Sequence, residues 1–418
     1  MNLRALSSAA LEIFKNKLFS RNKKIQSAYF LNIFLHFGDR LSSILLLIVF
    51  IRNLSNHDFS NYSEILVWMA GMALLCDFGT GTLLPIQIKK GFGLFPIYLM
   101  RGVFFSCLIV YSYFIEINFI EKVFLFSGVF ELICRSPQFF VEFISHRKLL
   151  ESSLLIKQFF VLFACCLVFY GEFNYDYALV ILSIGSIVSG LICLYAISKE
   201  IDNFQFDIPS VCVILKSGSL ICLAQILYFM RSGLPLLTIS SYDLSIAKEF
   251  RAIGTFQSLT QQITYIVCGA FYSYMVAKKL GSQKFFKEIF KLSMLAIFSV
   301  ALFLIISSKF DLFNLIFSIK LSEIFINFLI GMISVITIPL SLGIISYLNA
   351  KDQSKNLLFI TGLAVFFEAM TIAIYCAGLN PHLIFMSMGI FDISIILFGI
   401  YFNREILSYI RRYLKIAR

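Results

Sequence analysis

Long apolar runs alternate with short polar segments along the whole chain of 418 residues. An α-helix needs about 20 predominantly apolar residues to cross the hydrocarbon layer of a membrane. The pattern therefore predicts twelve transmembrane helices, of which the fifth and the ninth are short. The expected spans are residues 28–51, 62–84, 95–115, 123–145, 154–170, 177–198, 218–240, 253–276, 291–307, 323–349, 356–378 and 383–402.

Twelve crossings place both termini on one side of the membrane, and the basic residues indicate which side. If the termini are cytosolic, the cytosolic segments contain 24 of the 35 Lys and Arg residues, and the outer loops contain 6. Cytosolic loops of membrane proteins carry an excess of Lys and Arg. The bias predicts cytosolic termini, and because it alternates along the chain it also supports twelve helices.

The longest internal connection is polar and separates six spans from six, the pattern of a transporter built from two similar bundles. The basic N-terminal segment has apolar residues at helical spacing, which is consistent with an amphipathic helix on the cytosolic surface or with a floppy tail. The expected segments are a cytosolic N-terminal segment at 1–27, an N-terminal six-helix bundle at 28–198, a cytosolic linker at 199–217, a C-terminal six-helix bundle at 218–402 and a basic cytosolic tail at 403–418.

Composition agrees with an all-α polytopic membrane protein, since 59% of the residues are hydrophobic and only 14% are charged. The net charge of +11 lies mostly in loops, so nucleic acid is not an expected partner. The ten cysteines are scattered through apolar runs and the four histidines lie far apart, which gives no metal-binding spacing. The sequence contains no nucleotide-binding or catalytic motif. We expect no enzyme activity and no cofactor, and any uphill transport would use an ion gradient.

Eight charged residues fall well inside the expected spans. If all of them faced lipid, the insertion cost would be about 20–28 kcal/mol, more than the stability of most domains. They must therefore be paired or hydrated. These residues are Asp39, Arg40, Asp77, Glu131, Arg135, Arg231, Glu368 and Asp392.

The basic members of this set are candidates for binding an anion. A guanidinium group stays charged and binds two oxygens of a phosphate at once. Glu131 and Arg135 are four residues apart, so they can instead neutralise each other on one helix face. Arg231 has no acid nearby on its own helix and can contact substrate or bridge to Glu368 or Asp392.

The acidic members are candidates for coupling to an ion. A carboxyl group inside a membrane can take up a proton, which suits proton-driven transport, or it can form a structural contact between helices. We assign this coupling role to Asp39, Asp77, Glu368 and Asp392. Arg101 and Lys157 lie near the cytosolic ends of their spans, and we expect them to extend to the membrane surface.

The eighth span carries a polar stripe on an otherwise apolar helix. Its members repeat at intervals of three or four residues, so they share one face, which we expect to line a cavity. Gln257 and Gln261 are the candidates for substrate binding. The stripe consists of Gln257, Gln261, Thr264, Cys268 and Tyr272.

The turn from Arg52 to Tyr62, with the sequence RNLSNHDFSNY, and the Asp77-Phe78-Gly79 end of the second span resemble the multidrug/oligosaccharidyl-lipid/polysaccharide exporter superfamily. The chain is most similar to its bacterial Wzx-type (O-antigen) polysaccharide flippases. It departs from them where Ser55 and Ser60 replace common glycines and where Arg231 replaces an acid common in the seventh helix.

The resemblance implies a V-shaped pair of six-helix bundles in the bacterial inner membrane that opens alternately to each side. It implies transport of a polyprenyl-pyrophosphate-linked O-antigen or capsule repeat unit for polysaccharide and lipopolysaccharide biosynthesis, with membrane lipid and polysaccharide-assembly proteins as partners. Combined with the charges, it makes Arg40, Arg231 and Arg135 candidates for holding the pyrophosphate. A multidrug or cation antiporter of the same superfamily is an open alternative. A membrane polysaccharide polymerase is disfavoured because the sequence has no large outer loop.

Overall fold

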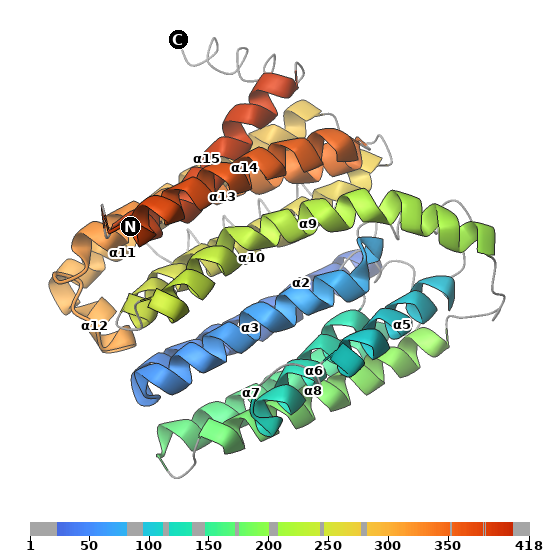
Figure 1. Cartoon of the computed structure of the whole chain (residues 1–418), viewed down its shortest axis with the longest axis horizontal. Coiled ribbons are helices and arrows are strands. Elements are labelled where there is room, and N and C mark those ends of the chain that lie inside the picture. The colour runs from blue at the N-terminus through green and yellow to red at the C-terminus, as the bar shows by residue number, and fades with distance from the viewer. Residues whose placement is uncertain are drawn as a thin grey trace.

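The computed structural model describes residues 23–81, 95–111, 117–135, 147–171, 175–199, 208–242, 246–276, 282–351, 353–378, 380 and 382–403. These residues form twelve long helices and the six-residue helix α12 (Figure 1). The helices are α2 (Lys23–Asn53), α3 (Asn56–Asp77), α5 (Phe95–Tyr111), α6 (Phe119–Cys134), α7 (Arg147–Phe169), α8 (Tyr175–Ser198), α9 (Ile208–Tyr242), α10 (Ala247–Val276), α11 (Ser282–Phe310), α12 (Leu312–Phe317), α13 (Phe325–Ala350), α14 (Ser354–Cys376) and α15 (Leu383–Phe402).

Each expected span corresponds to one of the twelve long helices, which confirms the all-α polytopic fold class. Eight spans among the described residues meet length and hydropathy criteria for crossing a membrane. Several helices begin earlier than expected, and α9 starts at Ile208, inside the segment expected to be a linker. The division into domains at residues 199–217 stays a prediction. The N-terminal amphipathic segment and the C-terminal tail lie almost entirely outside the described residues.

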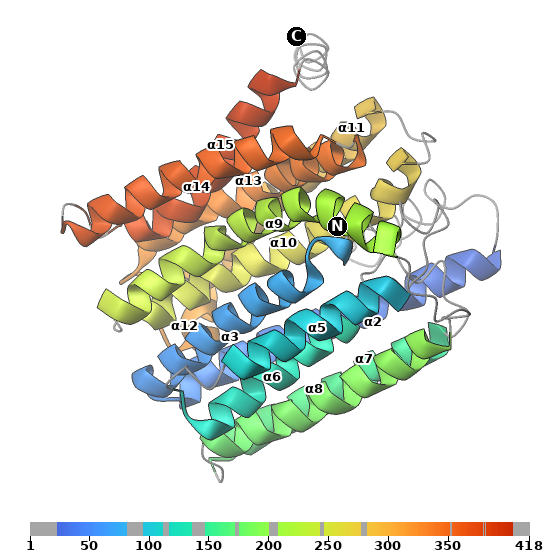
Figure 2. The same ribbon diagram turned by 45° about the vertical axis from the view of Figure 1, so that its right-hand side comes forward.

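The helices are arranged in two groups (Figures 1 and 2). In the N-terminal group, α7 packs against α8 and α2, while α6 packs against α8 and α3. In the C-terminal group, α13 packs against α10, α11 and α15, and α14 packs against α9 and α15. The groups meet mainly where α3 lies along α9 and where α2 approaches α10. We call these groups the N-half and the C-half.

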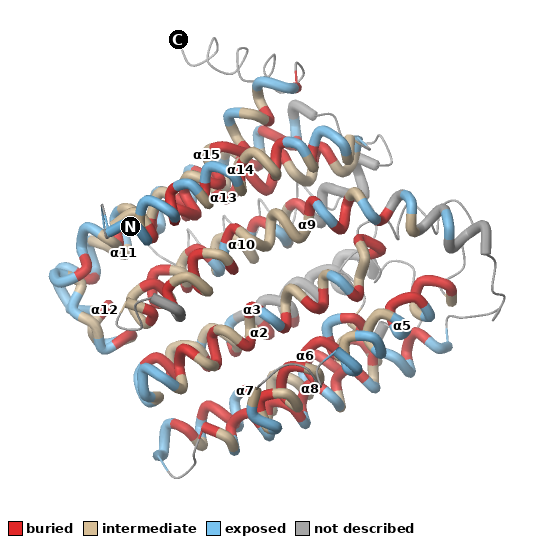
Figure 3. The backbone as a smooth tube through the Cα atoms, viewed as in Figure 1, coloured by how far each residue is buried: buried red, intermediate tan, exposed pale blue. Residues whose placement is uncertain are grey.

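Buried residues follow the helix faces that are turned toward neighbouring helices (Figure 3). The outward faces carry large apolar side chains, as expected where lipid is the solvent. On α11, for example, Met294, Phe298, Leu302 and Ile305 are 45–64% exposed and recur at helical spacing. The surface of the bundle is therefore apolar, and its polar groups are concentrated inside.

The α2–α3 hairpin begins its second helix earlier than the sequence suggested. Ser55 caps the N-terminus of α3, because its hydroxyl oxygen accepts a hydrogen bond from the backbone N–H of Asp58. Most of the polar segment before Tyr62 thus belongs to the first two turns of α3. We call the end of the molecule that carries this hairpin the outer end, in keeping with the predicted topology.

Candidate functional site

A network of charged residues joins three helices of the N-half. Arg135 follows α6 and pairs with Asp39 of α2 at 3.1 Å and with Glu131 at 2.5 Å, while Lys157 of α7 pairs with Glu131 at 2.9 Å. The Glu131–Arg135 pair is the alternative that the spacing of four residues left open beside a role of Arg135 in substrate binding. Arg135 is thus held by two acids of its own half. The side chain of Arg40 lies outside the described part of the chain.

A second buried ion pair lies in the C-half. The Nε and Nη2 atoms of Arg231 in α9 donate to the carboxylate of Asp392 in α15, at 2.8–3.1 Å. The hydroxyl groups of Ser334 and Ser341 in α13 also donate to this carboxylate, each at 2.8 Å. Arg231 is 2% exposed and Asp392 is fully buried. Of the two roles left open for Arg231, this structure contains the bridge to Asp392.

Arg101 and Lys157 do not extend to the membrane surface, so this prediction is wrong. Arg101 is 2% exposed, pairs with Asp77 at the end of α3, and donates to the hydroxyl of Thr80 and the carbonyl of Ile133. Lys157 is turned toward Glu131. Both cations have a carboxylate within reach inside the N-half, and pairing replaces the hydration they would find at the surface.

The polar stripe on α10 faces α13 at Gln257. This residue is 4% exposed, and its amide donates to the carbonyl of Gly331 at 3.0 Å. The prediction that the stripe lines a substrate cavity is therefore wrong for Gln257, because the glycine leaves a backbone acceptor accessible to it. Gln261 lines a cavity of about 280 Å³ that is mostly within the C-half, together with Tyr228, Arg231 and Tyr265. Tyr272 has no described side chain.

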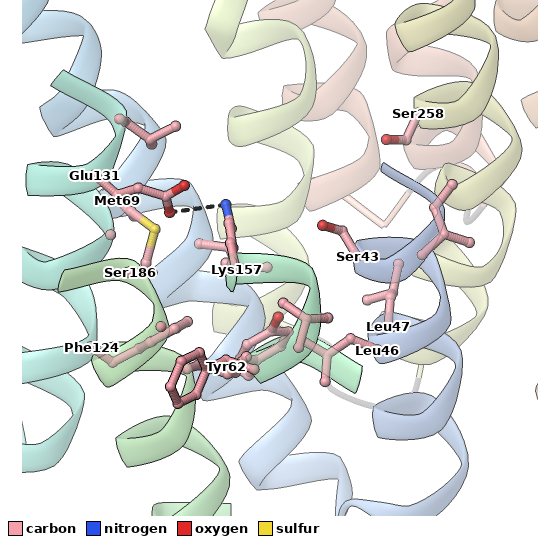
Figure 4. Close-up of a pocket in the computed structure, with 18 of the residues that line it drawn as sticks. Ser43, Leu46, Leu47, Tyr62, Met69, Phe124, Glu131, Lys157, Ser186 and Ser258 are labelled. Carbon is pink, nitrogen blue, oxygen red and sulfur yellow. Dashed lines mark ion pairs between the residues drawn. The ribbon is translucent and has the colours of Figure 1, made fainter. Parts of the chain in front are cut away.

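A cavity of about 290 Å³ lies between the two halves. Five helices of the N-half line it, and α10 closes it from the C-half with Arg251, Thr255, Ser258 and Gln262. Figure 4 shows the Lys157 ammonium group near the middle, with Ser43 and Ser258 on one side and Glu131 on the other. The cavity thus combines hydroxyl and amide groups with two basic side chains and with the carboxylate of Glu131, which pairs with Lys157.

Arg251 and Lys157 were not among the candidates chosen from the sequence. The sequence pattern placed Arg251 in an outer loop, because the eighth span was expected to begin at residue 253. In the structure α10 begins at Ala247, so Arg251 is one turn inside it. A helical register extended toward the N-terminus would have placed Arg251, Thr255, Ser258 and Gln262 on one face.

Three hydrogen bonds from basic side chains to backbone carbonyls cross between the halves at the outer end. Arg52 donates to Leu315 of α12 at 2.8 Å, and Lys248 donates to Leu54 at 2.9 Å. Arg251 donates to the carbonyl of Ser63 in α3 at 3.0 Å. We call these three bonds the outer latch. They hold the α2–α3 hairpin against α10 and α12.

At the opposite end, the halves touch through two glycines. Gly79 follows α3 with φ of +70°, and a Cβ atom there would lie 2.7 Å from the carbonyl oxygen of Gly218 in α9. A Cβ on Gly218 would in turn lie 2.6 Å from the carbonyl oxygen of Phe78. Such close backbone approach requires small residues. The α3–α9 seam is therefore tight at its inner end.

The groups that could bind a metal ion are sparse. Within the described residues, no group of three or more His, Cys, Asp or Glu residues has a suitable arrangement. The polar chemistry of the site therefore consists of ion pairs, hydroxyls and amides.

No protein-family profile matches the chain, and no curated protein matches it in sequence. Solved structures are similar in fold. Lipid II flippase MurJ in its inward closed conformation aligns with a TM-score of 0.67 and 12% identity, over 89% of this chain and 87% of MurJ. The MATE multidrug transporter DinF-BH aligns with a TM-score of 0.62 and 12% identity, over 93% and 97%. The Vibrio cholerae MATE transporter VcmN in the bent form aligns with a TM-score of 0.53 and 14% identity, over 92% and 97%. The chain therefore has the fold shared by MATE transporters and the MurJ flippase.

Proposed function

We propose that this protein is an alternating-access flippase of the bacterial inner membrane. Its substrate is a polyprenyl-pyrophosphate-linked oligosaccharide, an O-antigen or capsule repeat unit, which it passes from the cytosolic to the outer leaflet. The observation that carries this proposal is the cavity between the halves, lined by Lys157 and Arg251. The fold shared with a lipid II flippase supports the same class of substrate.

The chemistry of the cavity suits an anionic head group that carries sugars. The ammonium group of Lys157 and the guanidinium group of Arg251 come from opposite halves, so a diphosphate between them bridges the two. Serine, threonine and glutamine side chains of α2 and α10 offer donors and acceptors to sugar hydroxyls. The lipid tail stays in the bilayer while the head group moves through the cavity.

These cations replace the ones chosen from the sequence. Arg231 and Arg135 are held by acids of their own halves, so their charges are already compensated. Lys157 also has an acid partner, but Glu131 keeps its contact with Arg135 if the ammonium turns to a ligand. We therefore assign the head group to Lys157 and Arg251, and a supporting role to Arg135 and Arg231.

The outer latch links binding of the head group to opening of the outer end. Arg251 is engaged with the uncharged carbonyl of Ser63, and a diphosphate is a stronger acceptor for a guanidinium than a carbonyl. Binding of the head group from the inner side therefore competes for Arg251 and removes one bond of the latch. The outer end then opens and releases the substrate to the outer leaflet.

A second candidate function, export of organic cations, is favoured by a different feature. A groove of about 610 Å³ between α3, α5 and α6 is lined by Glu64, Glu121, Trp68 and Tyr111. None of its described lining residues is basic. Carboxylates next to aromatic rings attract organic cations. Fold similarity to multidrug transporters is compatible with this alternative.

Deletion of the gene separates the two functions. The flippase proposal predicts that a lipid-linked oligosaccharide accumulates on the cytosolic leaflet and that surface polysaccharide is lost. Complementation with Lys157→Met leaves both defects in place, whereas complementation with Glu64→Gln corrects both. The antiporter is supported if the deletion strain keeps normal polysaccharide but becomes more sensitive to organic cations. In that case Lys157→Met should correct the sensitivity and Glu64→Gln should not.

A further inference from the structure

Glu368 differs from the other three acids that were assigned a coupling role. Asp39 pairs with Arg135, Asp77 with Arg101, and Asp392 with Arg231. Glu368 lies in the middle of α14 and is fully buried, and neither of its carboxylate oxygens has a hydrogen-bond partner within the described part of the chain. The structure thus distinguishes one acid among four.

The helices packed against α14 determine which charged groups can act on Glu368. These helices are α9, α13 and α15. The charged groups that act on Glu368 are Arg231 of α9 and Asp392 of α15, which are paired with each other. On α13, the hydroxyl groups of Ser334 and Ser341 both donate to Asp392 and not to Glu368. The only cation acting on Glu368 in the described structure is therefore committed to another acid.

An ionised carboxylate in this position would be a buried charge without a partner. Such a charge is strongly disfavoured, and the group takes up a proton instead. With Glu368 protonated, the three side chains carry one positive and one negative charge, and the cluster is neutral. With Glu368 ionised, the cluster carries a net negative charge in the membrane interior.

We infer that Glu368 is the proton-binding site of this transporter and that its ionisation draws Arg231 away from Asp392. The coupling of this proton to transport rests on the proposed function. The carboxylic acid releases its proton to water that enters the C-half and becomes a carboxylate, and no other bond is made or broken. The guanidinium group is then shared between Glu368 and Asp392.

Movement of Arg231 is transmitted through α9. Pro235 lies one turn after Arg231 inside the same helix, where it removes a backbone hydrogen bond and allows bending. The inner part of α9 contacts α3 through Gly218, and the α3–α9 seam joins the halves. A change of partner at Arg231 therefore acts on the contact that must rearrange during alternating access.

Infrared difference spectroscopy of the purified protein tests this site without any substrate. Near neutral pH, where exposed carboxyl groups are ionised, the C=O band of a protonated carboxyl group should be present, should be lost as the pH is raised further, and should be absent in Glu368→Gln. The matched control is Glu64→Gln, which removes a carboxylate that accepts a hydrogen bond from Trp68 and should leave the band unchanged. A band that persists unchanged in Glu368→Gln overturns the inference.

A second variant keeps the test valid if Glu368→Gln does not fold. In Asp392→Asn the guanidinium group loses its carboxylate partner, so Glu368 should ionise, pair with Arg231 and lose its band. Retention of the Glu368 band in folded Asp392→Asn contradicts the switch. Because these spectra need no oligosaccharide, they can support the proton site even if the flippase proposal fails. Conversely, a protein that flips the oligosaccharide but lacks the band would support the flippase proposal and overturn the proton site.

Discussion

The guanidinium group of Arg251 in α10 donates to the backbone carbonyl of Ser63 in α3 across the two halves of the bundle, at 3.0 Å. The same residue lines the cavity in which we place the head group. One of the three bonds of the outer latch and one of the proposed contacts to the substrate therefore come from the same side chain. In the proposed mechanism, occupancy of the cavity is coupled in this way to opening of the outer end.

Removal of the Arg251 bond should favour the outward-open state. A hydrogen bond from a charged donor contributes about 1.5–3 kcal/mol, so Arg251→Gln should raise the open-to-closed ratio about tenfold or more. Distances between spin labels on the outer ends of α8 and α11 measure this ratio. Lys320→Gln is the control, because Lys320 is an exposed cation near the same end and pairs only weakly with Glu323. Equal distance distributions in Arg251→Gln and wild type would contradict a latch.

Arg135 should be needed for stability rather than for binding. Arg135→Met leaves the buried carboxylates of Asp39 and Glu131 without this cation, and breaking a buried ion pair costs about 3–5 kcal/mol. Lys157→Met should cost less, since Glu131 keeps Arg135. Thermal unfolding in one detergent compares the two variants. A higher midpoint for Arg135→Met than for Lys157→Met would refute this order.

Lys157 should contribute directly to the affinity for a diphosphate. Lys157→Met removes one charge-assisted contact and should weaken binding of a soluble polyprenyl-diphosphate analogue about tenfold. Isothermal titration calorimetry measures the affinity. Lys291→Met is the matched control, because Lys291 is an exposed lysine whose partner Glu288 lies on the same helix. An equal loss in both variants would indicate nonspecific attraction.

Gly79 and Gly171 share a φ of +70° but differ in their surroundings. Gly79→Ala combines the left-handed conformation, which costs about 1–2 kcal/mol, with a clash against Gly218 of about 1–3 kcal/mol. Gly171→Ala carries only the first cost, because no atom lies within 4 Å of its new Cβ. The thermal midpoint should therefore fall further in Gly79→Ala. Equal midpoints would mean that the α3–α9 contact adapts without cost.

The sequence predicted the features that depend on local pattern. Hydrophobic run lengths located all twelve long helices, and the spacing of Glu131 and Arg135 made their ion pair one of the two roles open to Arg135. Pairing across the bundle was harder to predict. Arg231 and Asp392 are 161 residues apart, so the bridge was one of several options for that arginine.

Residues near helix ends were the main source of error. Arg251 was assigned to a loop because its helix begins six residues earlier than the apolar pattern indicated. Arg101 was expected at the membrane surface, since nothing in its own helix reveals that Asp77 and Thr80 of another segment reach it. In both cases the tertiary partner decides the role, and one sequence does not contain that information in a local form.

Translocation in reconstituted vesicles tests the central claim most directly. Protein-containing vesicles receive a fluorescent polyprenyl-diphosphate-linked oligosaccharide, and a membrane-impermeant quencher measures its appearance in the opposite leaflet. We predict translocation by the wild type, a rate at least about tenfold lower for Lys157→Met, and a normal rate for Lys291→Met. A wild-type rate no faster than that of protein-free vesicles, or full activity in Lys157→Met, would contradict the account.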